Sequence, residues 1–421
     1  MLEHLRIIEL GQVIAGTFGG MILSDLGADV IKIEPPRGDA GRRSAIYGIG
    51  DESAIHVTHN RNKRSVVLDL KTEEGREVLL DLIRTADAVV ENFRPGVLDR
   101  LGIDFERMRA ADPGVVLVSV SGFGMDSPYR DLPAYDLILQ AMTGHMSIMG
   151  EAGRPPVIMG IPVADLLAGV FAAIAVLAGV EGRRHRGHGD HFDLAMFDVM
   201  VEMLAHVGTL YLNTGQDQEP RGSAHPFITP WQAFRCRDDA YIVVAPREEH
   251  FWAKLRTALG DPESLARPEF DEARSRQAHR DELLPLLEGI FEQRDSTTWL
   301  TTLQDAGVPT APVNRMPAVF DDPNVAARGM IRSFPMGDAT VHAIGNAIKV
   351  AGEEEPEATP PPALGADTEP VLRSLLGYDD AAIERLRAAG VFGDPAPTGP
   401  TIQAKSRAKS RAKSREGDRS P

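Results

Sequence analysis

Asp165 is the residue in this sequence whose type and position most suggest covalent chemistry. It follows the run Gly160-Ile-Pro-Val-Ala164 and stands at the start of a long apolar segment. A carboxylate can attack an activated carbonyl and form a covalent acyl intermediate. The competing interpretation is that Asp165 only caps the helix predicted by the apolar segment, because Asp is a preferred N-cap residue. Position alone favours the cap.

A second set of candidate residues is cationic. Basic side chains gather in 60–65, at Lys71, in 91–96 and at Arg100. If these segments end parallel strands, they lie where α/β sheets bind ligands, and a phosphate-bearing anion could be held there. Solvated surface charge explains such a cluster equally well.

Motifs for metal, phosphate or serine chemistry are missing from the sequence. It contains no HExxH, no paired Cys/His spacing and no GxSxG, and Gly11-Gln-Val-Ile-Ala-Gly16 resembles a phosphate-binding loop only loosely. His185, His188 and His191 are spaced at three residues, but two glycines between them make a poor ligand face. We therefore expect no metal site.

The elements that must position these residues belong to a chain of ordinary globular composition. Its 421 residues favour two domains, and its one cysteine, Cys236, fits a reducing, cytoplasmic environment. The N-terminus lacks the apolar core of a signal peptide. The longest apolar run, 166–180, is short for a bilayer span, so we expect a buried helix and no membrane role.

Charge divides the chain into an acidic body and a basic tail. Residues 401–421 carry seven Lys or Arg against Glu416 and Asp418, a net charge of +5, so that residues 1–400 carry −21 out of the overall −16. The tail repeats Ala-Lys-Ser-Arg and has little to bury, so we expect 396–421 to be disordered. A body this acidic is a poor nucleic-acid binder, and no nucleic-acid partner is expected.

Alternating strands and helices predict a doubly wound, Rossmann-like parallel sheet. The expected strands are 5–10, 29–33, 65–70, 88–90 and 115–120, with helices between them, and a second helix is expected over 191–207 after the one that Asp165 opens. We expect a large α/β domain in 1–207 that resumes in 331–395, and a smaller α+β domain in 231–311. Segments 208–230 and 312–330 are the linkers.

Blocks of sequence along nearly the whole body resemble the class III CoA-transferases, the family of formyl-CoA transferase. The matching stretches include Leu26-Gly-Ala-Asp-Val-Ile-Lys-Ile-Glu34, Asn60-Arg-Asn-Lys-Arg-Ser65, Leu68-Asp-Leu-Lys71, Val90-Glu-Asn-Phe-Arg-Pro-Gly96, Ser119-Val-Ser-Gly-Phe-Gly124, Ala306-Gly-Val-Pro-Thr-Ala-Pro-Val-Asn314 and Gly365-Ala-Asp-Thr368. So many blocks in one order make the resemblance specific.

The resemblance implies a transfer of coenzyme A from an acyl-CoA thioester to a free carboxylic acid, with Asp165 as the nucleophile. Acyl-aspartyl anhydride and aspartyl-CoA thioester are the implied intermediates. CoA is a substrate and not a resident cofactor. The implied CoA contacts are Ile14, Ala15, Leu68, Asp69, Leu70, Lys71, Asn92, Phe93, Arg94, Arg100, Ala134, Tyr135 and Asp136. An interlocked homodimer of ring-like subunits is also implied.

The sequence departs from formyl-CoA transferase where that enzyme contacts its substrate. Ile14, Pro35 and Pro133 replace a glutamine, an arginine and a lysine, and Ser223-Ala-His-Pro-Phe227 stands where a glycine-rich lid is expected. These differences argue against formyl-CoA and oxalate. We expect small dicarboxylic acids instead, with His225 and Arg221 near the distal carboxylate, because a histidine can donate to an oxygen at neutral pH.

Two other functions remain open. The family resembled here includes racemases that exchange the α-proton of 2-methylacyl-CoA with a His and an Asp as acid and base. Those enzymes have a Gly-His-Asp motif near the position of Tyr135-Asp136, where this sequence has no histidine. A CoA-binding module without catalysis is the other possibility, and the presence of Asp165 disfavours it.

Overall fold

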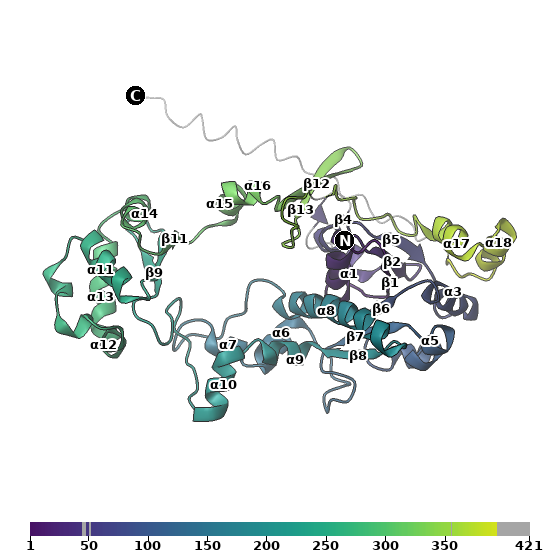
Figure 1. Ribbon diagram of the computed structural model, residues 1–421, viewed down its shortest axis with the longest axis horizontal. Helices are drawn as coiled ribbons and strands as arrows, with labels where there is room; N and C mark the ends of the chain where they lie inside the picture. The colour runs from purple at the N-terminus through teal and green to yellow at the C-terminus, as the bar shows by residue number, and fades with distance from the viewer. Residues whose placement is uncertain (44–47, 50–51, 355, 394–421) are drawn as a thin grey trace, which may run out of the picture. The chain divides into compact units, whose positions relative to one another are not determined.

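The computed structural model describes residues 1–43, 48–49, 52–354 and 356–393 (Figure 1). The chain divides into two compact units, each described by itself below. The first consists of Met1–Leu139, Ile161–Met203 and Gly329–Pro421, and the second of Gln140–Gly160 and Leu204–Arg328. The expected disordered tail, 396–421, lies outside the described residues.

A six-stranded parallel sheet forms the centre of the first unit, which confirms the α/β class predicted from the sequence. Its order is β5-β2-β1-β6-β7-β8. Runs of Ile and Val buried on both faces are typical of parallel strands covered by helices. The strands are β1 Arg6–Glu9, β2 Asp29–Glu34, β5 Arg64–Val67, β6 Ala88–Glu91, β7 Val116–Ser121 and β8 His191–Ala195.

The edge strand β8 corrects the helix that we expected to begin at His191. Leu117 pairs with His191 and Ser119 with Asp193 in parallel register. The segment His191-Phe-Asp-Leu-Ala195 alternates polar and apolar residues, which is the period of a strand with one covered face. Helix α9, Met196–Glu202, begins only after it.

Helices cover both faces of this sheet. On one face, α1 (Ala15–Asp25) and α8 (Val163–Arg186) share a core with alternate residues of β1, β2, β6 and β7. On the other face, α3 (Glu73–Ile83), α5 (Phe105–Ala111) and α17 (Thr368–Leu376) share a second core with the remaining strand residues. The other described helices of the unit are α2 Ala54–His59, α4 Val97–Leu101, α6 Asp136–Met142 (which continues into the second unit) and α18 Asp380–Ala388.

Glycines bring α1 and α8 into backbone contact. A Cβ added at Gly19 would lie 2.7 Å from the Gly169 carbonyl oxygen, and one added at Gly169 would lie 2.9 Å from the Ala15 oxygen. Helix α8 is long and apolar enough to pass a length-and-composition test for a membrane span. Its residues Ala168, Ala172 and others at that spacing are buried against α1 and the sheet, as in the central helix of a globular unit.

The second unit contains a small antiparallel sheet of order β11-β10-β9 packed against helices. Trp252, Phe291 and Trp299 form the centre of its core. The strands are β9 Gln232–Arg235, β10 Tyr241–Val244 and β11 Thr310–Pro312, and the main helices are α10 Ala205–Thr214, α11 Glu249–Ala258, α12 Ala273–Ala278, α13 Arg280–Phe291 and α14 Ser296–Asp305. Two strands of the first unit, β12 Ile331–Met336 and β13 Ala339–Ile344, form a separate hairpin.

Candidate active site

Asp165 lies in the first turn of α8 but does not cap it. The N-cap position belongs to Pro162, and no side chain caps the helix there. The half-buried carboxylate of Asp165 forms no hydrogen bond or ion pair with any described residue. The capping interpretation is therefore wrong, and this carboxylate has no local structural role.

Asp136, the first residue of α6, occupies the place that a cap would take. Its Oδ1 accepts a hydrogen bond from the Ala164 N–H at 2.7 Å. This bond satisfies one of the N–H groups that a helix leaves free at its start, and it brings a second carboxylate close to Asp165.

Two effects raise the pKa of Asp165 to about 6. Burial is the larger, because it disfavours the charged carboxylate, and repulsion from Asp136 adds to it. At pH 7 the group is still mostly ionised, and a carboxylate of raised pKa is a more basic nucleophile than an ordinary one.

The face of α8 that carries Asp165 meets the start of α1. Residues four apart lie on the same side of a helix, so Asp165 shares a face with Gly169, which contacts the Ala15 carbonyl. Ala15 is 2% exposed and can offer a ligand only its backbone. Ile14 is half-buried and is the N-cap of α1, with no side-chain cap, so the first N–H groups of α1 keep their hydrogen-bonding capacity.

Side-chain contacts hold several peptide groups of the turn between β1 and α1, residues 11–16. The Asn92 side chain accepts from the Gln12 N–H at 2.7 Å and donates to the Gln12 carbonyl at 2.9 Å. Val13, at φ 62°, donates to Asp39 at 3.1 Å. The side chain of Asn92 is therefore engaged in holding this turn.

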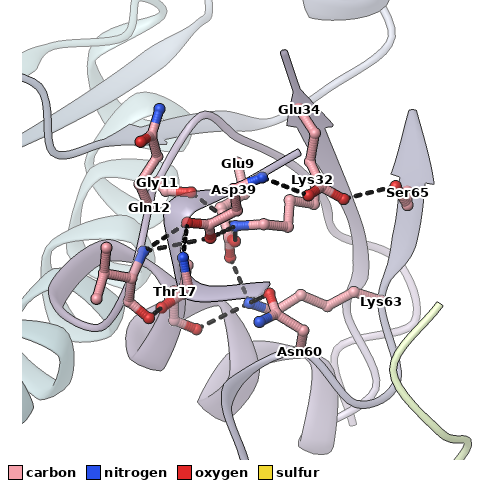
Figure 2. Close-up of polar contacts among 12 residues, drawn as sticks. Glu9, Gly11, Gln12, Thr17, Lys32, Glu34, Asp39, Asn60, Lys63 and Ser65 are labelled. Carbon is pink, nitrogen blue, oxygen red and sulfur yellow. Dashed lines mark hydrogen bonds and ion pairs between the residues drawn. The ribbon is translucent and has the colours of Figure 1, made fainter. Parts of the chain in front are cut away.

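A buried network of ion pairs and hydrogen bonds contacts this turn (Figure 2). Lys32 contacts Glu9 at 3.0 Å and the Gly11 carbonyl at 2.7 Å, while Lys63 contacts the second oxygen of Glu9 at 2.7 Å and the Thr17 carbonyl at 2.8 Å. The charged groups of Glu9 and both lysines are fully buried.

The network also shifts the pKa values of its lysines. Burial would lower the pKa of Lys32, but the carboxylates of Glu9 and Asp39 outweigh it and raise that pKa. Burial lowers the pKa of Lys63 to about 8, with Glu9 opposing the shift.

The network corrects our interpretation of the cationic segment 60–65. Lys63 is bound within the network, Arg61 pairs with Asp25 at 2.6 Å, and Arg64 pairs with Asp29. These side chains hold the fold together and are not available to an anionic ligand.

Other basic residues of the expected site are available. The side chains of Lys71, Arg94, Arg100 and Arg130 form no ion pair or hydrogen bond with any residue in the described ranges. A Cβ at Gly96 would lie 3.4 Å from Arg100 Nη1 and 3.5 Å from Arg130 Nη2, so this glycine, at φ 79°, lets two guanidinium groups approach. Arg130, which precedes the expected segment at 133–136, was not among the residues expected from the sequence.

Several residues expected to contact CoA are part of the core. Leu68 is 1% exposed within the second core cluster, and Leu70 and Phe93 pack against it. Asp69 accepts from the Lys71 N–H at 3.0 Å. The side chains of these residues position the neighbouring cations.

The segment near 134–136 is more open. Ala134 packs against the first core cluster and lies close to Gly122. Tyr135 is 71% exposed, so that its ring is available to a ligand.

His225 belongs to the second unit, where its ring lies 5.4 Å from that of Trp231. Nδ1 accepts from the Phe227 N–H at 3.1 Å, so the proton of the neutral ring lies on Nε2. Nε2 has no partner among the described side chains. Burial lowers the pKa of His225, and the positive charges of nearby His206 and Arg247 lower it further, which makes His225 a neutral donor at pH 7.

Arg221 is exposed and forms no ion pair within the described part of the chain. It is close enough to Arg280 to lower the pKa of that residue, which burial also lowers as the larger effect. Arg280 Nη1 is buried without a hydrogen-bond partner. Arg221 and Arg280 thus place two positive charges close together in the second unit, with Asp281 also acting on Arg280. The sequence did not single out Arg280, because Arg221 lies 59 positions away in the chain.

No group of three or more potential metal ligands occurs in the described ranges.

Comparison with known proteins gives matches along most of the chain. The sequence model of CoA-transferase family III matches residues 2–368. The succinyl-CoA:glutarate CoA-transferase of Homo sapiens is 34% identical over 93% of this chain and 89% of its own length. The acetyl-CoA:oxalate CoA-transferase of Acetobacter aceti is 36% identical over 85% of this chain and 91% of its own length. The succinyl-CoA:mesaconate CoA-transferase of Haloarcula hispanica is 35% identical over 83% of this chain and 90% of its own length.

Solved structures give the same result. A CAIB/BAIF family protein from Brucella suis has a TM-score of 0.80 at 35% identity, covering 88% of this chain and 98% of that one. Rv3272 from Mycobacterium tuberculosis has a TM-score of 0.78 at 30% identity, covering 87% and 98%.

Proposed function

The chain belongs to CoA-transferase family III, and we propose that it moves CoA between small dicarboxylic acids with Asp165 as the covalent nucleophile. As a member of this family it is a class III CoA-transferase. The observation that carries the proposed role of Asp165 is its carboxylate, which has no partner among the described residues and a pKa raised to about 6. A carboxylate that stabilises nothing locally is available for attack.

The proposed reaction is a sequence of exchanges at carbonyl carbon. Asp165 attacks the thioester carbonyl of the donor and the carbon–sulfur bond breaks. CoA departs as the thiolate, and an acyl-aspartyl anhydride is formed. The thiolate then attacks the aspartyl carbonyl, releases the donor carboxylate and leaves aspartyl-CoA. The acceptor carboxylate attacks aspartyl-CoA and expels the thiolate, which leaves a second acyl-aspartyl anhydride. The thiolate then attacks the acyl carbonyl of this anhydride, forms the product thioester and releases Asp165. No net proton or electron transfer is required.

Each tetrahedral intermediate places negative charge on an oxygen near Asp165. The uncapped first turn of α1, opposite Asp165, offers backbone N–H groups and the positive end of a helix dipole. The fixed turn at 11–16 keeps these donors in place before the charge develops. Water must be excluded, because hydrolysis of either covalent intermediate wastes the thioester.

We assign the phosphates of CoA to the unpaired cations Lys71, Arg94, Arg100 and Arg130. Guanidinium groups match phosphate oxygens in a bidentate manner, while Lys71 acts as a point charge.

The acid exchanged is proposed to be a small dicarboxylate. For the distal carboxylate we keep the candidates expected from the sequence, His225, which offers a neutral Nε2–H, and Arg221. Relatives named for succinate, glutarate and mesaconate support this substrate class. The departure at Ile14 disfavours oxalate, and the similarity to an acetyl-CoA:oxalate enzyme makes oxalate the acid to test against it.

Racemisation is the second candidate. It needs an acid and a base on opposite sides of the α-carbon. The charged group that acts on Asp165 is another carboxylate, Asp136, and no histidine contributes to its pKa shift. This favours transfer. We further propose an interlocked homodimer in the cytoplasm, as the family resemblance implies.

One assay tests the function. Succinyl-CoA and acetyl-CoA are each mixed with succinate, glutarate, mesaconate, oxalate and branched monocarboxylates, and new thioesters are scored by kcat/KM. We expect dicarboxylates of four or five carbons to exceed monocarboxylates by at least about tenfold, a difference of about 1.4 kcal/mol. A preference for monocarboxylates would contradict the substrate proposal.

The covalent role of Asp165 is tested by trapping. After incubation with donor thioester, hydroxylamine should modify the peptide that contains Asp165, and Asp165→Asn should remove both the modification and transfer. Deuterium uptake at the α-carbon without transfer would instead identify a racemase.

A further inference from the structure

Glu91 is a buried carboxylate that the proposed mechanism does not use. It is the last residue of β6 and is 5% exposed. Its Oε2 accepts a hydrogen bond from the Phe93 N–H at 2.6 Å. Glu91 therefore fixes the start of the loop that contains Asn92 and Arg94, where β6 gives way to α4.

A chain of hydrogen bonds connects Glu91 to the sheet edge. Glu91 lies opposite Ser119 of β7, and the Ser119 hydroxyl is hydrogen-bonded to it. Ser119 Oγ is also 2.8 Å from Nε2 of His191 on β8. Three neighbouring strands thus carry one connected polar chain, which lines a small pocket of about 30 Å³ beside α4 and α5.

Other charged groups face this chain. Arg94 from the loop, Asp99 from α4 and Asp104 before α5 line the same pocket, and Asp193 of β8 lies close by. Burial raises the pKa of Glu91 to about 7, repulsion from Asp193 adds to it, and the bonds from Ser119 and Phe93 oppose it. Burial also lowers the pKa of His191, with the charges of Asp193 and Asp99 opposing the shift.

We propose that Glu91 is a positioning residue for the CoA site, and that its ionised form holds the Asn92–Gly96 loop in the conformation that binds CoA thioesters. An ionised carboxylate is a stronger acceptor for the Phe93 N–H than a protonated one. Asn92 is held separately, by its own pair of hydrogen bonds to Gln12, so the group that depends on Glu91 is Arg94, one of the proposed phosphate contacts.

This inference rests on the proposed CoA site. It predicts that CoA affinity falls as pH drops through neutrality, because Glu91 then takes up a proton. The loss should appear in KM and not in kcat, since Glu91 touches neither the thioester nor Asp165.

The test measures binding of CoA and of dephospho-CoA to the full chain by calorimetry between pH 6 and pH 8.5. Dephospho-CoA removes the 3′-phosphate, which itself titrates near pH 6. We expect the wild type to bind about fivefold more weakly at pH 6 than at pH 8. Glu91→Gln should bind about fivefold more weakly at pH 8 and show little further change with pH, with kcat kept within about twofold.

Two further variants separate this role from a general charge effect. Asp99→Asn removes one charge from the same pocket, where Asp99 makes no side-chain hydrogen bond with a described residue, and should leave the pH profile unchanged. Ser119→Ala removes a bond that lowers the pKa of Glu91, so the midpoint of the profile should move to higher pH.

Amide hydrogen exchange gives a readout that needs no ligand. The peptide around Phe93 should exchange faster in Glu91→Gln than in the wild type at pH 8. If wild-type protein binds no CoA, the proposed function fails while the exchange result still tests Glu91. If CoA binds and Glu91→Gln keeps the wild-type pH profile, or if Asp99→Asn reproduces the loss, the inference about Glu91 is wrong and the function stands.

Discussion

Replacing Asp165 by asparagine should abolish CoA transfer and at the same time stabilise the protein at alkaline pH. Burial and Asp136 disfavour the charged carboxylate and raise its pKa from 3.8 to about 6. The folded state therefore holds the proton more tightly than the unfolded chain. The stabilisation by the protonated form is present below about pH 4 and is lost as pH rises through about 6.

The size of the effect follows from the shift. A difference of about 2 pKa units corresponds to about 3 kcal/mol at 1.36 kcal/mol per unit, which is an upper bound. Asp165 is half-buried, and solvent reduces the cost of its charge, so we expect a gain of about 1–2 kcal/mol in the free energy of unfolding for Asp165→Asn at pH 8. At pH 4.5 the gain should be small.

Urea unfolding of both proteins at pH 4.5 and pH 8 measures this gain, and a coupled thioester assay measures transfer. The matched control is Asp198→Asn, which alters an exposed aspartate in the first turn of α9. That change removes a favourable interaction with the helix dipole and should cost up to about 1 kcal/mol. A variant at Asp165 that is less stable than wild type at pH 8, or that keeps more than about 1% of the transfer rate, would refute the reasoning.

Three other changes test separate parts of the site. Asp136→Asn keeps a side-chain oxygen that can accept from the Ala164 N–H at the start of α8, but it removes the charge that repels the Asp165 carboxylate. The pKa of Asp165 should therefore fall, and the acid limb of the kcat/KM profile should move to lower pH. The move should be less than two units, because the burial of Asp165 remains. Lys71→Ala should raise KM for CoA thioesters about tenfold with kcat within about twofold, measured by initial rates. Lys63→Met should lower the free energy of unfolding by about 3–5 kcal/mol, measured by urea, because Glu9 loses one of its buried cations.

The sheet could be predicted from the sequence because its central strands are short runs of Ile and Val between amphipathic helices. The edge strand β8 could not. Strand β8 follows α8 after a short polar turn and continues directly into α9. The apolar residues of β8 and α9 together therefore have the pattern expected of one helix. What fixes β8 as a strand is its pairing with β7, between residues more than 70 positions apart.

In the candidate site, too, some features could be predicted from the sequence and others could not. Asp165 was found by resemblance, and its raised pKa was not predicted because Asp136 lies 29 positions away and meets it only through the contact of α6 with α8. The cationic segment at 60–65 was misinterpreted for a related reason. The sequence shows that Lys63 is charged, but it does not show that the fold of the sheet brings Glu9 within hydrogen-bonding distance of it.

The buried charges of the first unit differ in what they do for stability. Glu9 and Asp39 are neutralised by buried lysines, and they fix the peptide groups of the turn at 11–16. Asp165 and Glu91 are shielded from water without a cation, and burial raises the pKa of both. A neutral amide of the same shape would avoid that cost at either position. The negative charge on either group therefore costs stability at neutral pH, and we attribute that charge to a role that an amide cannot perform. That role is attack on a carbonyl at Asp165 and a titratable hydrogen-bond acceptor at Glu91.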